Sequence, residues 1–218
     1  MLRIVVLAVV VAAAVADPCC TPDQWQGYIG SITGAVTDGM SRTTKVNGMM
    51  AYDYINKMVA QTTTVTEGSI TMTNKTIINF NTRMMYLIDT TRDICEVKSI
   101  DQPMNQACTP PGAEEVGQFY FGSGTGNELD ATSYKFTVSS MAGYLSVTSL
   151  DCLPISLVTY GQIGNTATMT TTDFVDVMLR IEDPSIFDPP SSCDEAKVTP
   201  LENQGTHSFF GTPTTHHV

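Results

Sequence analysis

Histidine is almost absent from this chain, and where it occurs it lies close to the C-terminus. The 218 residues include three histidines, His207, His216 and His217. The rest of the chain has no imidazole base for Ser-His-Asp or Cys-His catalysis and no imidazole ligand for a metal centre. Carboxylates could still act as an acid–base pair, but no spacing marks two of them as partners. We therefore expect a protein that is not an enzyme. The terminal histidine pair could hold a metal weakly, although a solvated tail is the simpler interpretation.

Positive charge is also scarce. The chain has 11 lysines and arginines against 22 aspartates and glutamates, which gives a formal net charge of −11 at pH 7. Recognition of nucleic acids needs clustered basic residues, so this composition argues against a nucleic acid as partner. An acidic surface aids solubility. It suits a secreted protein in extracellular fluid, or one in an acidic compartment such as the lysosomal lumen.

Long apolar runs are missing except at the start. Arg3 precedes the apolar residues 4–15, and Ala14-Val15-Ala16 resembles a cleavage site, so residues 1–16 are predicted to be a signal peptide. Spanning a bilayer takes about 20 apolar residues, so we expect no transmembrane segment. The length and composition of the chain after the signal peptide predict one domain over residues 17–197 and a polar, disordered tail over residues 198–218.

Sustained helical periodicity is missing as well. Short alternating segments with frequent turn residues predict a mostly β protein, an antiparallel sandwich or barrel-like sheet. Residues 76–80 and 84–88 predict a hairpin. Strict alternation along residues 174–181 would place Val177, Leu179 and Ile181 on one face and Phe174 on the other. Short helical turns should follow near the C-terminus, because Asp183-Pro184 is typical of a helix start.

Six cysteines are present, and no two of them form a Cys-x-x-Cys pair, so the spacing of a zinc site is absent. In a secreted chain six cysteines predict three disulfides, and spacing alone allows fifteen pairings. Asn74-Lys75-Thr76 is the single N-x-[ST] sequon, which predicts one N-glycan at Asn74.

Four short motifs follow one another along the chain. They are Cys19-x-x-Pro22-x-x-Trp25-x-Gly27, then Tyr52-Asp53, then Asp151-Cys152-Leu153-Pro154, and finally residues 174–193, with I-x-D-P-S-x-F, a proline pair and a cysteine. Each is weak alone, but in this order and with the cysteines in register the chain resembles the ependymin-related family. The resemblance covers residues 19–197.

The resemblance narrows the cysteine pairings. It implies the disulfides Cys19–Cys152 and Cys95–Cys193. Cys20 and Cys108 are then left for the third bond, at positions that depart from the pattern of the vertebrate members.

The resemblance also implies a fold and a function. Members have curved antiparallel sheets, a half-barrel or sandwich around a deep apolar pocket, similar to bacterial lipoprotein carriers. They form homodimers, associate with calcium and are thought to bind lipids. The resemblance therefore implies a secreted carrier of a hydrophobic ligand. The alternative is a component of the extracellular matrix or of cell adhesion, with calcium-dependent contacts. The calcium ligands cannot be named from the sequence.

The candidate pocket residues are apolar side chains on predicted strands. They are Ile78, Phe80, Met85, Leu87, Phe119, Phe121, Tyr134, Phe136, Tyr144, Val177, Leu179 and Ile181. From the sequence alone the same residues could form a closed sandwich core, and the resemblance is what favours a pocket.

Overall fold

The computed structural model describes residues 18–123, 126–194 and 197–201. The predicted signal peptide at residues 1–16 lies outside the described residues, as do His207, His216 and His217. The predicted tail begins at Val198, but the structure continues in a strand as far as Pro200. In this part of the chain, no helix is long and apolar enough to cross a membrane.

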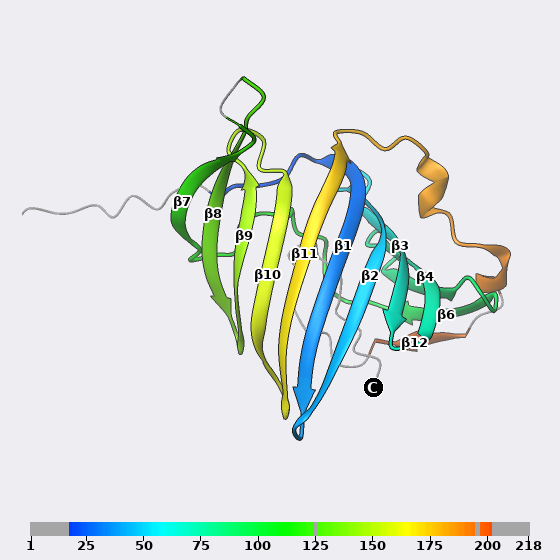
Figure 1. Ribbon diagram of the computed structural model, residues 1–218. Helices are drawn as coiled ribbons and strands as arrows, with labels where there is room; N and C mark the ends of the chain where they lie inside the picture. The colour runs from blue at the N-terminus through cyan, green and yellow to red at the C-terminus, as the bar shows by residue number, and fades with distance from the viewer. Residues whose placement is uncertain (1–17, 124–125, 195–196, 202–218) are drawn as a thin grey trace, which may run out of the picture.

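The described residues fold into one open sheet of twelve strands (Figure 1). The strands are β1 (Gln24–Thr37), β2 (Met40–Asp53), β3 (Met58–Glu67), β4 (Ile70–Asn79), β5 (Met84–Asp89), β6 (Ile94–Ser99), β7 (Glu114–Phe121), β8 (Leu129–Val138), β9 (Met141–Thr148), β10 (Pro154–Ile163), β11 (Thr166–Met178) and β12 (Val198–Pro200). Two short 3₁₀ helices follow β11, η1 (Pro184–Phe187) and η2 (Ser191–Cys193). The predicted mostly β fold and the helical turns near the C-terminus are confirmed.

The sheet consists of two meanders joined at one seam. Its order is β12-β6-β5-β4-β3-β2-β1-β11-β10-β9-β8-β7. Strands β1 to β6 follow one another in space as in sequence, and so do β7 to β11. The seam is the antiparallel pairing of β1 with β11. The neighbours all run antiparallel except β12, which lies parallel to β6.

Tight turns allow the central strands to be long. Asp38 and Gly39 connect β1 to β2, and both have positive φ, 50° and 79°. A two-residue turn with positive φ at both positions matches the twist of a hairpin, and glycine adopts it without strain. Figure 1 shows the β1–β2 and β10–β11 hairpins projecting together beyond the rest of the sheet.

Each face of the first meander carries a row of apolar side chains. On one face, here called the inner face, Trp25, Tyr52, Val59, Ile78 and Met85 are directly paired across five strands and are at most 1% exposed. On the opposite, outer face, the adjacent row is also apolar. It consists of Ala51, Ala60, Ile77, Tyr86 and Val97. Both faces therefore need a cover.

A different segment covers each face. The crossover from β6 to β7, residues 100–113, lies on the inner face, where Met104 and Ala107 pack into the cluster around Trp25. Figure 1 shows this crossover passing behind β9 to β11, with both ends of the sheet curving back around it. The C-terminal segment, residues 181–193, covers the outer face with Phe187 and Cys193. The Asp183 carboxylate caps η1 by accepting the Ser185 N–H at 3.0 Å.

Candidate functional site

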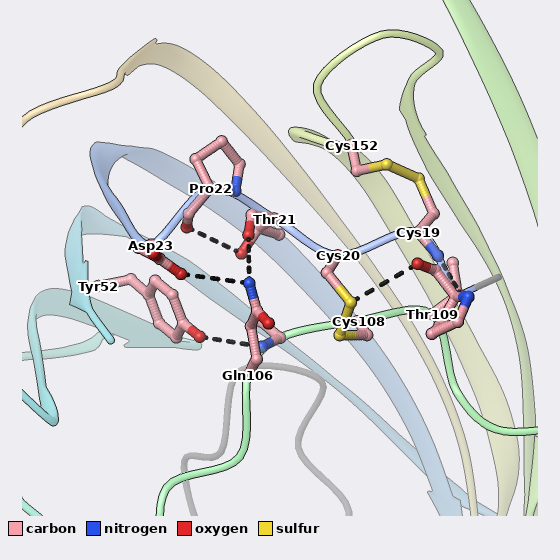
Figure 2. Close-up of a disulfide and its surroundings, with 12 residues drawn as sticks. Cys19, Cys20, Thr21, Pro22, Asp23, Tyr52, Gln106, Cys108, Thr109 and Cys152 are labelled. Atoms are coloured by element: carbon pink, nitrogen blue, oxygen red, sulfur yellow. Dashed lines mark hydrogen bonds between the residues drawn. A yellow bond between two sulfur atoms is a disulfide. The ribbon is translucent and has the colours of Figure 1, made fainter. Parts of the chain in front are cut away.

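The inner face is closed at one end by two segments that cross it, the N-terminal residues 19–23 and the crossover. Cys19 is bonded to Cys152 and Cys20 to Cys108, so both segments are tied together and to the turn before β10 (Figure 2). The third disulfide, Cys95–Cys193, fixes the C-terminal segment to β6. Cys19–Cys152 and Cys95–Cys193 are the bonds that the family resemblance implies, and Cys20–Cys108 joins the two cysteines that it left over.

Hydrogen bonds complete this clamp. The Thr21 N–H donates to the carbonyl of Ala107 at 2.8 Å, and the Thr109 N–H donates to the carbonyl of Cys19 at 2.7 Å. Beneath them the Tyr52 hydroxyl accepts the Ala107 N–H at 2.9 Å (Figure 2). Burial raises the pKa of Tyr52 to about 12, so its phenol keeps its proton at alkaline pH values where an exposed tyrosine ionises.

Beyond the clamp, the inner face carries apolar groups that are only partly covered. Leu157 on β10 packs against the cluster around Trp25 and also against a second cluster formed by Phe136, Leu145 and Val147. Leu157 pairs with Leu145, so it lies between the two clusters. The side chains around them are half-buried. They include Phe80, Leu87, Tyr134, Val138 and Leu153.

Farther along the same face, threonine replaces the apolar side chains. Alternate positions of β11 are Thr166, Thr168, Thr170 and Thr172, and all four are half-buried. Their hydroxyls pair with those of β1: Thr33 with Thr170 at 2.9 Å, Thr37 with Thr166 at 2.7 Å, and Ser31 with Thr172 at 3.1 Å. The inner face therefore passes from an apolar end to a hydroxyl-lined end.

On the outer face of these strands, large apolar side chains are exposed. Ile32, Tyr144, Tyr160 and Met169 are 52%, 39%, 37% and 54% exposed. Thr171 and Val158 join Ile32 to Tyr144 across the sheet. Among the described residues, the C-terminal segment covers the outer face of the first meander but not this apolar area.

Two small cavities lie on the outer face. The larger, about 320 Å³, lies between the sheet and the C-terminal segment and is lined by Lys75, Glu182 and Asp183 among others. Lys75 Nζ donates to the carbonyl of Asp188 at 3.3 Å, and burial lowers the pKa of Lys75. The smaller, about 270 Å³, lies over Gly30 beside Lys45 and Asp173. Charged groups in both linings make them poor sites for an apolar ligand.

The predicted pocket residues do not surround one cavity. Of the twelve, Ile78, Phe80, Met85, Leu87 and Val177 belong to the inner cluster around Trp25, and Tyr134 and Phe136 to the second inner cluster. The others lie elsewhere. Ile181 belongs to the C-terminal segment and packs against the outer-face cluster, and Phe119, Phe121, Tyr144 and Leu179 are exposed.

Strand β11 departs from the strict alternation that its sequence predicts. A register shift opposite Gln26 and Tyr28 coincides with a positive φ of 52° at Asp176. This bulge places one extra residue on β11, so Phe174 and Val177 both reach the inner cluster. The strand ends at Met178, and Leu179 is 55% exposed. Placing Val177, Leu179 and Ile181 on one face was therefore wrong.

The residues that join the two inner clusters are not marked by any pattern in the sequence. Leu157 and Leu145 carried no motif that would single them out, and Met104 lies in a segment without periodicity. The alternating threonines of β11 were visible in the sequence, as residues 166, 168, 170 and 172.

A metal centre has no evident set of ligands in the described part of the chain. No group of three or more His, Cys, Asp or Glu side chains there could hold a metal ion. The calcium association implied by the resemblance therefore has no residues assigned to it.

Comparison with known proteins gives a family and several relatives. A family model described as Ependymin matches residues 68–193. The chain is 26% identical to ependymin-related protein 1 of Haliotis asinina, over 81% of this chain and 90% of that protein. It is also 26% identical to mammalian ependymin-related protein 1 of Rattus norvegicus, over 83% and 78%. An uncharacterized conserved protein from Thermus thermophilus is similar in structure, with a TM-score of 0.46 and 10% identity over 84% of this chain and 91% of that one.

Proposed function

The chain belongs to the ependymin family, and on that premise we propose that it is a non-enzymatic binding protein that holds a lipid-like molecule against the inner face of its sheet. Family membership and three disulfides fit a secreted, disulfide-bonded protein. The proposal concerns the ligand, its place on the sheet and the absence of catalysis.

The position of Leu157 carries this proposal. Leu157 packs against both inner clusters and is still half-buried, so an apolar surface continues beyond the clamp. A binding site for a hydrophobic molecule needs such a surface, with few polar groups to fix the orientation. The hydroxyls of β1 and β11 supply polar groups at the far end. An acyl chain would lie over Leu157, with its polar end toward Thr170 and Thr172.

The test compares two leucine substitutions seven residues apart. Leu157→Glu puts a charge on the inner face, where a bound acyl chain would desolvate it. Leu150→Glu is the matched control, because Leu150 lies in a turn and is 88% exposed. In a titration with a fluorescent fatty acid, we expect Leu157→Glu to raise Kd by about tenfold or more, equivalent to about 1.4 kcal/mol. Leu150→Glu should bind as wild type does.

Two results would contradict this assignment. One is equal binding by a folded Leu157→Glu variant, with near-UV circular dichroism as the check of folding. The other is the absence of any lipid when protein purified from its native fluid is extracted and analysed by mass spectrometry.

The outer face favours a homodimer as the assembled form. The apolar area around Ile32 and Met169 is uncovered by any described segment, and a second copy would bury it against its own equivalent. Sedimentation velocity should then show a dimer in the wild type and a monomer in an Ile32→Lys variant. A wild-type monomer at all concentrations would contradict the dimer.

A second candidate function is a structural role in the extracellular matrix or in cell adhesion. The excess of carboxylates, 22 against 11 basic residues, supports it, because such a surface attracts calcium. The two candidate functions differ in what they predict. In a matrix or adhesion protein, lipid binding would be incidental, and calcium would change stability or assembly.

A further inference from the structure

Strand β7 ends the sheet, and its far side is open. It pairs with β8, and no other strand of the described chain lies along its second edge. All eight residues of β7 are exposed. Such an edge presents backbone N–H and C=O groups that another strand can pair with.

The register shows which of these groups are available. The carbonyl of Asp130 on β8 accepts the Ser149 N–H at 2.9 Å, so it points toward β9. Backbone groups alternate in direction along a strand, so those of Ala131 point toward β7, where its partner is Phe119. The N–H and C=O of Phe119 point back toward Ala131. Those of its neighbours Gln118 and Tyr120 therefore point away from the sheet.

The side chains at this edge are aromatic and acidic. Phe119, Tyr120 and Phe121 are 40%, 56% and 46% exposed, and the rings of Phe119 and Phe121 meet edge to face at 5.3 Å. Strands β7 and β8 and the residues just before β8 carry four carboxylates, Glu114, Glu115, Glu128 and Asp130, against one amine, Lys135.

The opposite end of the sheet is protected in ways that β7 is not. There β12 covers β6, has only three residues and ends in Pro200, which has no N–H to offer. Short strands, proline and lysine are the usual means of blocking an edge. Strand β7 has eight residues and contains neither proline nor lysine.

We propose that β7 is a docking edge for an extended, basic segment of another protein, which pairs with the backbone of Gln118 and Tyr120 as an added strand. Basic side chains of that segment would meet the carboxylates beside β7, and its apolar side chains would cover Phe119 and Phe121. A second copy of this chain fits less well, because it would bring one acidic edge against another.

The experiment uses a labelled eight-residue peptide of alternating lysine and valine, and measures fluorescence anisotropy on the full mature chain. We expect binding that weakens with salt. The same peptide with glutamate in place of lysine should not bind. A lysine–valine peptide with an N-methyl group on every backbone amide should also fail, because it has no N–H to donate along either edge. These two peptides test the proposal on the unchanged protein.

A protein variant then locates the site. Gln118→Pro removes the outward N–H of β7 and leaves the bonds to β8, and Gln118→Ala keeps that N–H and serves as the control. Gln118→Pro should weaken binding of the lysine–valine peptide by about tenfold, and Gln118→Ala should not. Fatty-acid binding should be unchanged in both variants, which separates this edge from the inner face.

Three outcomes would overturn the proposal. They are equal binding of the glutamate peptide, equal binding of the N-methylated peptide, and equal binding by Gln118→Pro. A dimer that Gln118→Pro abolishes would assign the edge to a second copy instead.

Discussion

The Tyr52 hydroxyl accepts a hydrogen bond from the buried backbone N–H of Ala107, which joins the central inner row to the crossover. Tyr52→Phe would leave that N–H without its partner. An unpaired buried donor costs about 1–3 kcal/mol, so we expect the free energy of unfolding to fall by that amount in a urea titration. Tyr120→Phe, at an exposed position, is the control and should have no effect. A loss below about 0.5 kcal/mol in Tyr52→Phe would mean that the crossover does not depend on this bond.

The same tyrosine should make stability depend on pH in the alkaline range. Burial raises the pKa of Tyr52 from 10.0 to about 12, so between these values the folded state keeps a proton that the unfolded state has lost. The stabilisation is complete below pH 10 and is lost as the pH rises through about 12. Absorbance at the phenolate band should show a step near pH 12 from Tyr52, and this step should be missing in Tyr52→Phe. If all tyrosines titrate together near pH 10, the ring is not buried in solution.

Gly143 should not tolerate a side chain. A Cβ there would meet the carbonyl oxygen of Val158 and lie 2.7 Å from Cζ of Phe136, which covers this glycine on the inner face. We expect Gly143→Ala to destabilise the fold by about 1–3 kcal/mol, as overpacked sites do. Gly34→Ala is matched, because Gly34 also lies in a central strand but has nothing within 4 Å of the added Cβ. Equal melting temperatures for the two variants would show that both the Phe136 ring and the β10 backbone at Val158 adjust freely.

The disulfide Cys95–Cys193 holds the C-terminal segment on the outer face and closes a separation of 98 residues. Replacing both cysteines with alanine should lower the free energy of unfolding by about 4–5 kcal/mol in the chain-entropy model. It should also make residues 181–193 the first site of limited proteolysis, because without the disulfide they are held by a few apolar contacts and by hydrogen bonds such as those to Gln26 and Lys75. Cleavage that begins elsewhere, with unchanged stability, would mean that Phe187 alone secures the segment.

Calcium tests the role of the acidic surface. If calcium binds the folded chain, the melting temperature should rise with calcium concentration in the range of about 0.1–1 mM, at constant ionic strength, and EDTA should reverse the rise. Magnesium at the same concentration is the control for charge screening. An unchanged melting temperature would leave the carboxylates as a solubility device.

Local patterns predicted the parts of this fold that depend on neighbouring residues. The hairpin of residues 76–88 formed as expected, with Ile78 opposite Met85. What failed depended on distant segments or on backbone exceptions. The bulge at Asp176 shifted the face of Val177 relative to Phe174, and a positive φ at an aspartate is not evident from alternation. The cover that Met104 gives to the inner face likewise follows from the path of the crossover and not from any periodicity around it.

The inner-face site was harder to predict than the fold. Alternation identified apolar strands, but which of them share a face depends on the seam between β1 and β11. That seam places Leu157 within reach of both apolar clusters, although it lies more than 120 residues from Trp25 in the sequence. The Cys19–Cys152 disulfide could be predicted from the family resemblance, because the motifs that carry the resemblance contain both cysteines.

The seam also sets the order of events during biosynthesis. The first meander is complete once Ser99 has left the ribosome, because its strands pair with their neighbours in sequence. Strand β1 then waits with one edge open until β11, which ends at Met178, has been made. Throughout the synthesis of the second meander, one edge of the fourteen-residue strand β1 therefore has no strand to pair with. Closure of the sheet therefore has to wait for β11, which is made after both cysteines of the Cys19–Cys152 disulfide.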